Sequence, residues 1–182
     1  MTSKFSNKTL KTWYSSSGLP SFFYPKSLEN EKFSETFKSK VKSVLCPTIQ
    51  ESKSWVFYYT PTAKNIVTNE TDFVFGFGYL CSRYIFDRGY CTYIHYSDLA
   101  KYLESKELTE KELSWMYADV VFVDGVKGLT CDTREADLFT SYLYKRITSN
   151  KKTVLCLLQD IPDSVMAPIS FTLKNSVTLG EL

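Results

Sequence analysis

A run of seven residues, Asp119 to Gly125, most limits the folds open to this chain of 182 residues. Its middle is four consecutive apolar residues, Val120 to Val123. A strand with one face in water would alternate apolar and polar residues, so the run predicts a strand buried on both faces. Asp124 then stands at the carboxyl end of the strand, where ligands bind in open α/β sheets. An Asp-Gly pair also starts turns, and on this run alone that is the simpler explanation of Asp124.

Apolar runs and amphipathic segments alternate on both sides of this strand. The further predicted strands are residues 55–60, 91–96, 153–158 and 176–179. The predicted helices are residues 30–45, 73–86, 97–103, 108–117, 133–148 and 163–174. This alternation predicts an α/β fold, a three-layer doubly wound parallel sheet with helices on both faces.

The boundaries of these elements follow from local signals. Cys46-Pro47 is expected to end the first predicted helix, and Ser97-Asp98 to cap the helix that follows the second strand. Residues 1–17 are polar and are expected to form a mobile or lightly docked tail. We therefore divide the chain into a basic N-terminal tail and lead-in helix, residues 1–50, and an α/β domain, residues 51–182.

The overall net charge of +2 is too small to indicate a nucleic-acid-binding protein. The first 53 residues hold nine Lys and four acids, a net +5, whereas the remainder holds thirteen basic and sixteen acidic residues, a net −3. The five Cys include no CxxC pair, which is typical of buried free thiols in a reducing compartment. His95 is the only His, so the usual zinc site is not expected, and a Ser-His or Cys-His pair would rest wholly on His95, for which a packed or surface position is the simpler explanation. No secretory signal or membrane-spanning run is present in the sequence, and a cytoplasmic location is predicted.

The order of these pieces resembles the AAA+ ATPase domain of bacterial helicase loaders of the DnaC/DnaI type and of the related transposition protein IstB. Residues 18–30 resemble the lead-in segment of those proteins, and residues 55–60 the strand before their phosphate loop. Residues 75–94 resemble their first helix, with its Arg-Gly ending, and the next strand. Residues 96–99 match the Asp-Leu pair that follows this strand in those proteins. Residues 120–125 occupy the Walker B strand, and residues 153–160 the strand that carries sensor 1.

The sequence departs from this family at the nucleotide site. A phosphate loop requires the pattern G-x-x-x-x-G-K-[ST], but residues 60–72 contain no Gly, and Lys64 is followed by Asn65. The Walker B strand of the family ends in two acids, whereas here Asp124 is followed by Gly125. Gln159 is the nearest candidate for sensor 1. The resemblance thus implies a degenerate nucleotide site at Lys64, Asp124 and Gln159, with Asp124 as the one candidate metal ligand.

We therefore expect a catalytically inactive AAA+-like protein, without a cofactor, that acts by binding in DNA replication or transposition. Its expected partners are a replicative helicase, a helicase loader or another AAA+ subunit, together with single-stranded DNA. A monomer and an oligomer both fit the sequence, and the Lys, Asn, Ser and Tyr content would suit a phage or mobile element. The candidate residues for nucleic-acid or partner contacts are basic: Lys38, Lys40, Lys42, Arg134, Lys145 and Arg146.

Two alternatives remain open. The first is an active ATPase with an atypical phosphate loop, in which Lys64 reaches the phosphates and Asp124 holds Mg²⁺. The second is an unrelated Mg²⁺-dependent α/β enzyme, in which Asp98, Asp124 and Asp160 form a carboxylate cluster at strand ends. For the basic residues of the late helix, ordinary surface charge is the simpler explanation.

Overall fold

The structure, a computed structural model, describes residues 3–24, 34–59, 70–105, 110–127, 134–158 and 177–178. Its helical elements are α1 (Asn7–Ser16), the 3-10 turn η1 (Ser21–Phe23), α3 (Glu35–Lys40), the π-helical turn η2 (Val41–Leu45), α4 (Cys46–Glu51), α5 (Glu70–Asp87), α6 (Tyr96–Glu104), α7 (Glu110–Tyr117) and α8 (Arg134–Thr148). Its strands are β1 (Val56–Tyr59), β2 (Thr92–His95), β3 (Val120–Val126), β4 (Lys152–Leu157) and β5 (Val177–Thr178). The predicted strand-helix alternation is therefore confirmed within these ranges.

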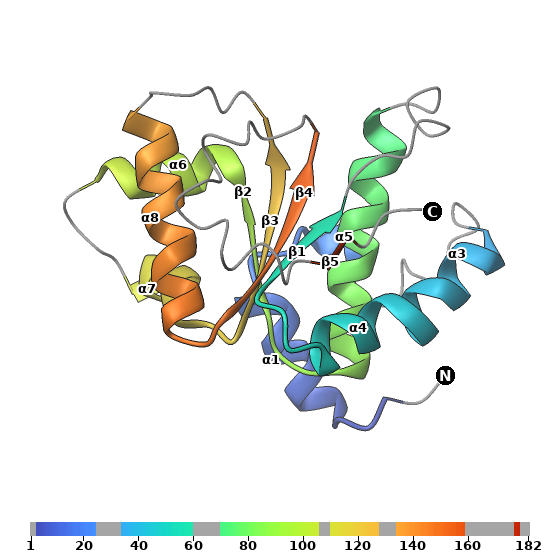
Figure 1. Ribbon diagram of the computed structural model, residues 1–182. Coiled ribbons are helices and arrows are strands. Elements are labelled where there is room, and N and C mark those ends of the chain that lie inside the picture. The colour runs from blue at the N-terminus through green and yellow to red at the C-terminus, as the bar shows by residue number, and fades with distance from the viewer. Residues whose placement is uncertain are drawn as a thin grey trace.

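The five strands form one parallel sheet in the order β2-β3-β4-β1-β5. Parallel neighbours need crossover connections, and these place helices on both faces of the sheet. In Figure 1, α6, α7 and α8 lie on one side of the sheet and α3, α4 and α5 on the other. The predicted three-layer fold is confirmed.

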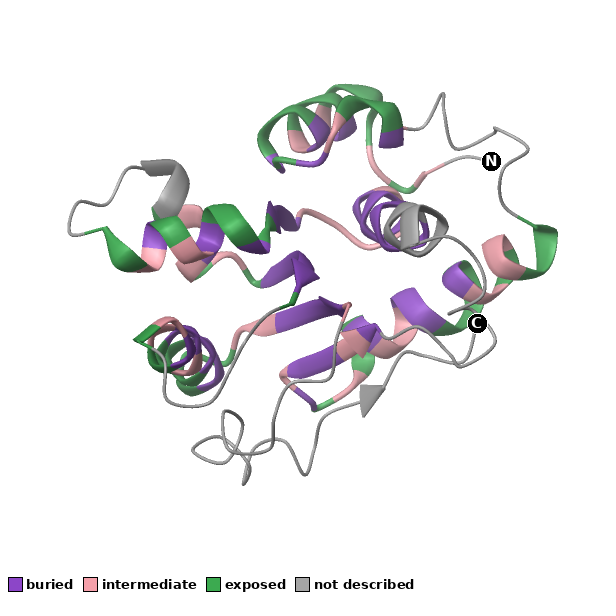
Figure 2. Ribbon diagram, turned by 90° about the horizontal axis from the view of Figure 1, so that it is seen from above, coloured by how far each residue is buried: buried purple, intermediate pink, exposed green. Residues whose placement is uncertain are grey.

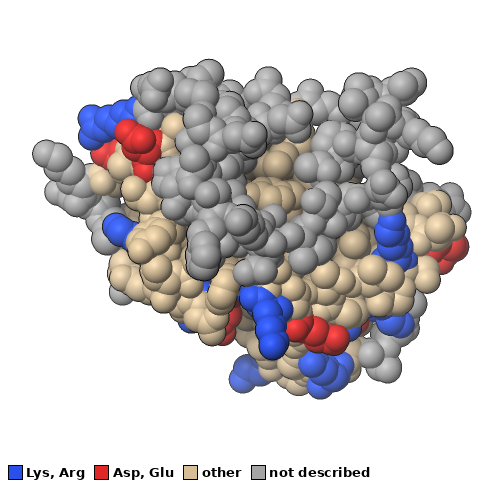
Figure 3. Space-filling view, in the orientation of Figure 1, with Lys and Arg blue, Asp and Glu red and all other residues tan. Residues whose placement is uncertain are grey.

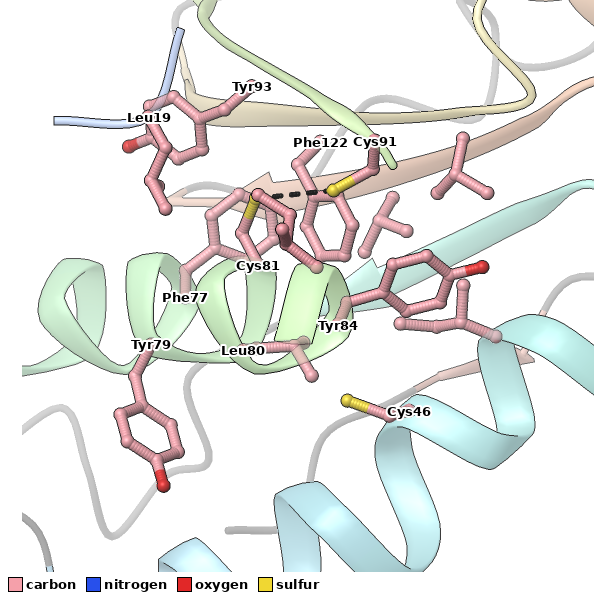
Figure 4. Close-up of a cluster of buried hydrophobic side chains, with 14 of the residues drawn as sticks. Leu19, Cys46, Phe77, Tyr79, Leu80, Cys81, Tyr84, Cys91, Tyr93 and Phe122 are labelled. Carbon is pink, nitrogen blue, oxygen red and sulfur yellow. Dashed lines mark hydrogen bonds between the residues drawn. The ribbon is translucent and has the colours of Figure 1, made fainter. Parts of the chain in front are cut away.

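Each face of the sheet has its own apolar core. Phe57, Phe122 and Val154 point toward α5, where they meet Phe77 and Tyr84 among other buried side chains. Figure 4 shows Phe77 and Tyr84 of α5 beside Phe122 of the sheet, and their ring centroids lie 5.5 and 5.8 Å from that of Phe122. The alternate positions of the same strands belong to a second cluster with α6, α7 and α8: Val56, Val121, Val123, Leu155 and Leu157. This double burial explains why the run from Val120 shows no polar alternation.

The first predicted helix does not end at Cys46-Pro47, as we had expected. Ser34 caps it, since its side chain accepts a hydrogen bond from the Phe37 N–H, and helical structure continues through η2 and α4 to Glu51. The backbone N–H of Cys46 bonds to the Val41 carbonyl, five residues earlier. This wide turn brings Pro47 into the first turn of α4, where a missing N–H is tolerated.

The N-terminal segment, which we expected to be mobile or lightly docked, is docked and contains a helix. Leu10 and Tyr14 of α1 are buried against the core. The Tyr14 hydroxyl donates a hydrogen bond to the Ser82 carbonyl of α5, and the Tyr93 N–H of β2 donates to the Ser17 carbonyl. In Figure 2 the helix nearest the N-terminus carries its exposed positions on its outer side.

Two further expectations concern the cysteines and the membrane. Four Cys are free and buried, as predicted: Cys46, Cys81, Cys91 and Cys156. Cys131 and the predicted helix 163–174 lie outside the described residues. Among the described residues, we find no helix with the length and apolar character that crossing a membrane requires.

Candidate functional site

Polar side chains from four neighbouring strands converge at the carboxyl end of the sheet, on the face covered by α5. They are Tyr59 of β1, Tyr93 of β2, Asp124 of β3 and Cys156 of β4. Tyr59 is in register with Cys156, and Asp124 with His95, the residue two positions after Tyr93. Because side chains alternate along a strand, Tyr93 and His95 leave β2 on the same face.

Asp124 is the centre of this group and is only 2% exposed. The Tyr93 hydroxyl donates a hydrogen bond to its Oδ2 atom. Its Oδ1 atom is buried and has no hydrogen-bond partner of good geometry among the described residues. Burial raises the pKa of Asp124 above its ordinary value, although the Tyr93 hydroxyl and the Cys156 thiol act in the opposite direction.

Gly125 follows Asp124, where the helicase loaders that the sequence resembles carry a second acid, and its backbone conformation favours Gly. Its φ is +70°, in the left-handed region that favours Gly. A Cβ atom there would lie 2.6 Å from Nε2 of His95. The β3-β4 register also shifts between Val123 and Val126, as in a β-bulge. Both the backbone conformation and the nearby His95 ring therefore favour Gly at position 125.

His95 is exposed and also begins α6. Its Nδ1 atom accepts a hydrogen bond from the Ser97 N–H and lies 2.8 Å from the Ser97 hydroxyl. The N-cap is therefore His95 instead of the expected Ser97-Asp98 pair, because the helix starts one residue earlier, at Tyr96. This cap fixes the ring with its Nε2 atom toward Gly125.

Tyr59 fills the space between the end of β1 and α5. It is 2% exposed, and its ring centroid lies 5.5 Å from that of Phe77. A Cβ atom on Gly76 would lie 2.5 Å from the Tyr59 hydroxyl oxygen, so the absence of a side chain at Gly76 makes room for the tyrosine. Burial raises the pKa values of both Tyr59 and Tyr93 above their ordinary value, so both hydroxyls stay protonated well above neutral pH.

Of the predicted nucleotide-site residues, the structure describes Asp124 alone. Lys64 and Gln159 lie outside the described residues, as does Asp160 of the alternative carboxylate cluster. Asp98 is exposed on the first turn of α6. Within the described ranges, no three His, Cys, Asp or Glu side chains are grouped as a metal site would require.

The predicted basic residues fall into two groups. On α3 and η2, Lys38 is half-buried and lies 2.9 Å from Glu35, Lys40 is half-buried, and Lys42 is exposed. On α8, Arg134 and Lys145 are exposed. A role of these five residues in partner binding stays a prediction.

Arg146 does not belong to an exposed basic edge, and we correct that expectation. Its side chain is fully buried at the amino end of the sheet. Its guanidinium donates to the Thr153 hydroxyl and to four carbonyls, those of Trp115, Met116, Ala118 and Lys152. Five donors in a rigid fork suit this cage of oxygens, which a Lys could not fill in the same way.

Sequence reasoning missed Tyr93 as the partner of Asp124. One signal was available, because two successive parallel strands, 91–96 and 120–124, were predicted. Once they are paired, polar residues near their carboxyl ends must meet. The left-handed backbone of Gly125 had no comparable signal beyond the Asp-Gly pair itself.

The described residues do not fit the hydrolytic site of a Mg²⁺-dependent ATPase. Oδ2 of Asp124 already accepts from a neutral tyrosine, and burial disfavours the ionised carboxylate that a metal requires. The place of the acid that would polarise the attacking water is occupied by Gly125, with His95 beside it. We therefore derive no reaction step through a nucleotide.

Comparison with known proteins gives a relationship of fold. No family model matches the sequence, and no curated protein matches it. Solved structures with a similar fold include a DNA replication initiation factor, with a TM-score of 0.52 and 16% identity over 84% of this chain and 48% of that one. Replication initiator DnaA bound to AMPPCP and single-stranded DNA gives a TM-score of 0.53 and 16% identity over 90% of this chain and 51% of that one.

AMPPCP-bound DnaA from Aquifex aeolicus is similar to the same degree, with a TM-score of 0.52 and 15% identity over 89% of this chain and 51% of that one. The present chain thus spans about half the length of the initiator structures that it matches. The predicted α/β fold is thus shared with solved structures of replication initiators, and at these identities the similarity is one of fold.

Proposed function

We propose that this chain is a catalytically inactive AAA+-type protein that acts as a binding or regulatory factor in DNA replication or transposition. Its partners would be a replicative helicase, a helicase loader or another AAA+ subunit, in the cytoplasm. The fold supports the replication context, because the similar structures are replication initiators. The geometry at the end of β3 supports the loss of hydrolysis.

One observation carries the proposal of inactivity. The second acid of an ATPase cannot simply be restored here, because position 125 combines a φ of +70° with a Cβ direction that points into the His95 ring. A side chain at that position would strain the backbone and displace the imidazole. This backbone and the neighbouring imidazole support a site that works without a second acid.

Nucleotide titration is the direct test. ATP and ADP with Mg²⁺ would be titrated into the whole chain by calorimetry, and thermal shift would be recorded in parallel. We expect no binding at millimolar nucleotide and no release of phosphate. Micromolar binding with steady phosphate release would overturn the proposal.

A second candidate, the active ATPase, is favoured by one observation. Oδ1 of Asp124 is a buried acceptor without a partner among the described residues, and a metal ion would satisfy it. Under this alternative, Asp124→Asn and Lys64→Ala would each abolish any nucleotide response. Asp137→Asn, which changes an exposed acid on α8, is the matched control and would leave the response intact.

Capture of partners tests the binding function separately. Purified replicative helicase and helicase loader from a candidate host would be passed over the immobilised chain, with and without nucleotide. We expect nucleotide-independent retention of one of them. Retention that requires ATP would instead support the active ATPase.

A further inference from the structure

Two of the free cysteines lie against each other in the core between α5 and β2. The sulfur atoms of Cys81, on α5, and Cys91, just before β2, are 3.7 Å apart, and both side chains are fully buried. Figure 4 shows the two sulfur atoms turned toward each other. A covalent S–S bond is about 2.0 Å long, so bonding requires only a modest movement of the two side chains.

The other described cysteines are not placed for such a bond. Cys46 lies on α4, and Cys156 lies on β4 next to Asp124. Among the four cysteines that the structure describes, we find one sulfur–sulfur contact, that of Cys81 with Cys91. An oxidant that reaches the core is therefore expected to link these two residues in preference to the others.

The turn between the two cysteines is open on one side. The N–H groups of Arg88 and Gly89 both donate to the Tyr84 carbonyl, which ends α5. A Cβ atom on Gly89 would meet no atom within 4 Å, so the turn is not packed against the rest of the chain there. The backbone before Cys91 therefore has room to adjust when a bond forms.

The N-terminal helix is tied to residues that flank both cysteines. The Tyr14 hydroxyl of α1 donates to the carbonyl of Ser82, the residue after the first cysteine. The hydroxyl of Tyr90, the residue before the second cysteine, donates to the Ser16 carbonyl at the end of α1. The docking of α1 is therefore coupled to the backbone on which both thiols stand.

The outer side of α1 faces solvent, so the helix forms a cover over the pair. Its buried residues are Leu10 and Tyr14, which belong to the same apolar cluster as the two cysteines. At the lower end of the molecule, where Figure 1 places α1, Figure 3 shows Lys and Arg side chains at the surface. Release of this helix is a local opening through which a small oxidant reaches the sulfur atoms.

We propose that Cys81 and Cys91 form a redox-sensitive dithiol, covered by α1, which a peroxide converts to a disulfide and a thiol reductant restores. One thiolate attacks the O–O bond of hydrogen peroxide, which leaves a sulfenic acid and releases one water. The second thiolate attacks that sulfur, the S–O bond breaks, and a second water leaves as the S–S bond forms. The two sulfur atoms lose two electrons, and the two peroxide oxygens gain them. A disulfide of this kind is transient in a reducing compartment.

The bond would restrain β2, the strand that supplies Tyr93 and His95 to the candidate site. It fixes the start of that strand to the C-terminal half of α5. The inference goes beyond the proposed function and does not depend on it, because it requires neither nucleotide nor partner. ATP binding by the chain would overturn its proposed inactivity and leave this proposal standing.

Peptide mapping after oxidation tests the pairing. Trypsin cuts after Arg83 and Arg88, so the two cysteines fall in separate peptides, residues 65–83 and 89–101. The folded chain would be treated with hydrogen peroxide, its remaining thiols alkylated in urea, and the digest analysed by mass spectrometry. We expect these two peptides to be joined, in roughly tenfold excess over any other cysteine pair, and to be separated by dithiothreitol.

Two controls show whether the pairing comes from the fold. The chain oxidised while unfolded in urea is expected to give mixed pairs. Cys46→Ala, which removes another buried thiol, should keep the link between the two peptides, whereas Cys81→Ala should abolish it. Mixed pairs in the folded chain, or sulfinic acid without a link, would overturn the proposal.

The rate of disulfide formation tests α1 as the cover. Tyr14→Phe removes the hydroxyl bond to the Ser82 carbonyl and should speed the reaction roughly fivefold, because α1 opens more often. Tyr142→Phe is the matched control, since it removes a buried hydroxyl bond to the Trp115 carbonyl on the other face of the sheet. It is expected to stay within about twofold of the unchanged chain. Equal rates in the two variants would overturn the role of α1.

Discussion

The two ends of the sheet differ in how their buried ionisable side chains are hydrogen-bonded. At the amino end, Arg146 is fully buried, and the hydrogen bonds of its guanidinium among the described residues all go to carbonyl or hydroxyl oxygens. Nearby, the Lys152 ammonium donates to the carbonyls of Ile49, Gln50 and Ser52 at the end of α4. At the carboxyl end, Asp124 is buried with one oxygen bonded to Tyr93 and the other without a partner among the described residues.

The comparison distinguishes Arg146, whose buried charge has a structural role, from Asp124, a buried polar group that is not fully hydrogen-bonded among the described residues. A guanidinium whose donors all find acceptors joins three segments, namely the end of α7, the start of β4 and α8. Asp124 accepts one hydrogen bond from the neighbouring strand through Tyr93, but its other oxygen is unsatisfied among the described residues, which lowers stability. The amino end is therefore built for stability, and the carboxyl end keeps a polar group at the position where this fold holds ligands.

The largest expected effect is at Arg146. Arg146→Met removes five hydrogen bonds and leaves buried carbonyls without donors, so we expect the free energy of unfolding to fall by about 3–5 kcal/mol. Urea denaturation measures the change, and Lys145→Met, at the exposed neighbouring position, should change it by less than about 0.5 kcal/mol. Equal effects of both substitutions would remove the distinction between the two ends.

The next effect is at Gly125. Gly125→Ala places a Cβ in a left-handed backbone 2.6 Å from the His95 ring, so we expect a loss of about 1–3 kcal/mol. The double variant H95A/G125A should recover the part due to the imidazole and keep the part due to the backbone. If Gly125→Ala proved neutral by thermal denaturation, the claim that position 125 excludes a second acid would be wrong.

A smaller effect is expected at Lys152. Lys152→Met keeps the packing of the aliphatic stem but leaves the last carbonyls of α4 without the ammonium, and should lower stability by about 1–2 kcal/mol. Lys151→Met, at the adjacent position, loses one ion pair with Asp119, which is 86% exposed, and should lower stability by less. Hydrogen exchange of the α4 amides would localise the loss to that helix.

The smallest effect, and the one that changes with pH, is expected at Asp124. Burial raises its folded pKa above an unfolded value near 4, so its contribution to stability is fully present below pH ~4 and is lost as pH rises through the folded pKa. Asp124→Asn cannot ionise and should escape that loss. Relative to the unchanged chain, we expect the variant to gain stability between pH 4 and 7, by about 1 kcal/mol or less at pH 7. A variant that loses stability over this range would indicate a carboxylate held by a favourable charge.

Much of the fold could be predicted because it depends on apolar runs and on the regular spacing of apolar residues. The run from Val120 predicted its own burial on both faces, and the alternation of strands and helices predicted the three layers. The failures have local causes. Pro47 normally ends a helix, but a π-helical turn placed it in the first turn of the next one. A tail rich in Ser and Lys gave little sign that Leu10 and Tyr14 would dock it.

The candidate site was harder to predict than the fold. Its place at the end of an apolar run indicated Asp124, and the resemblance to helicase loaders implied that a second acid is missing at Gly125. The tyrosine from a neighbouring strand and the orientation of His95 depend on tertiary register, which a single sequence does not encode in any short pattern. Arg146 was wrongly placed on the surface because a helical period cannot distinguish a flanking Arg from one turned inward to meet carbonyl oxygens.

The contact between α1 and the sheet has a consequence for association between molecules. β2 is an outer strand, and an outer strand exposes backbone groups that can recruit a strand from another chain. The Tyr93 N–H of β2 donates a hydrogen bond to the Ser17 carbonyl. Gly18 lies so close to β2 that a Cβ atom on it would be 2.5 Å from the Tyr93 carbonyl oxygen. The segment that follows α1 thus covers the β2 edge at Tyr93 against intermolecular β-pairing, and a chain shortened by its first 19 residues would be expected to self-associate.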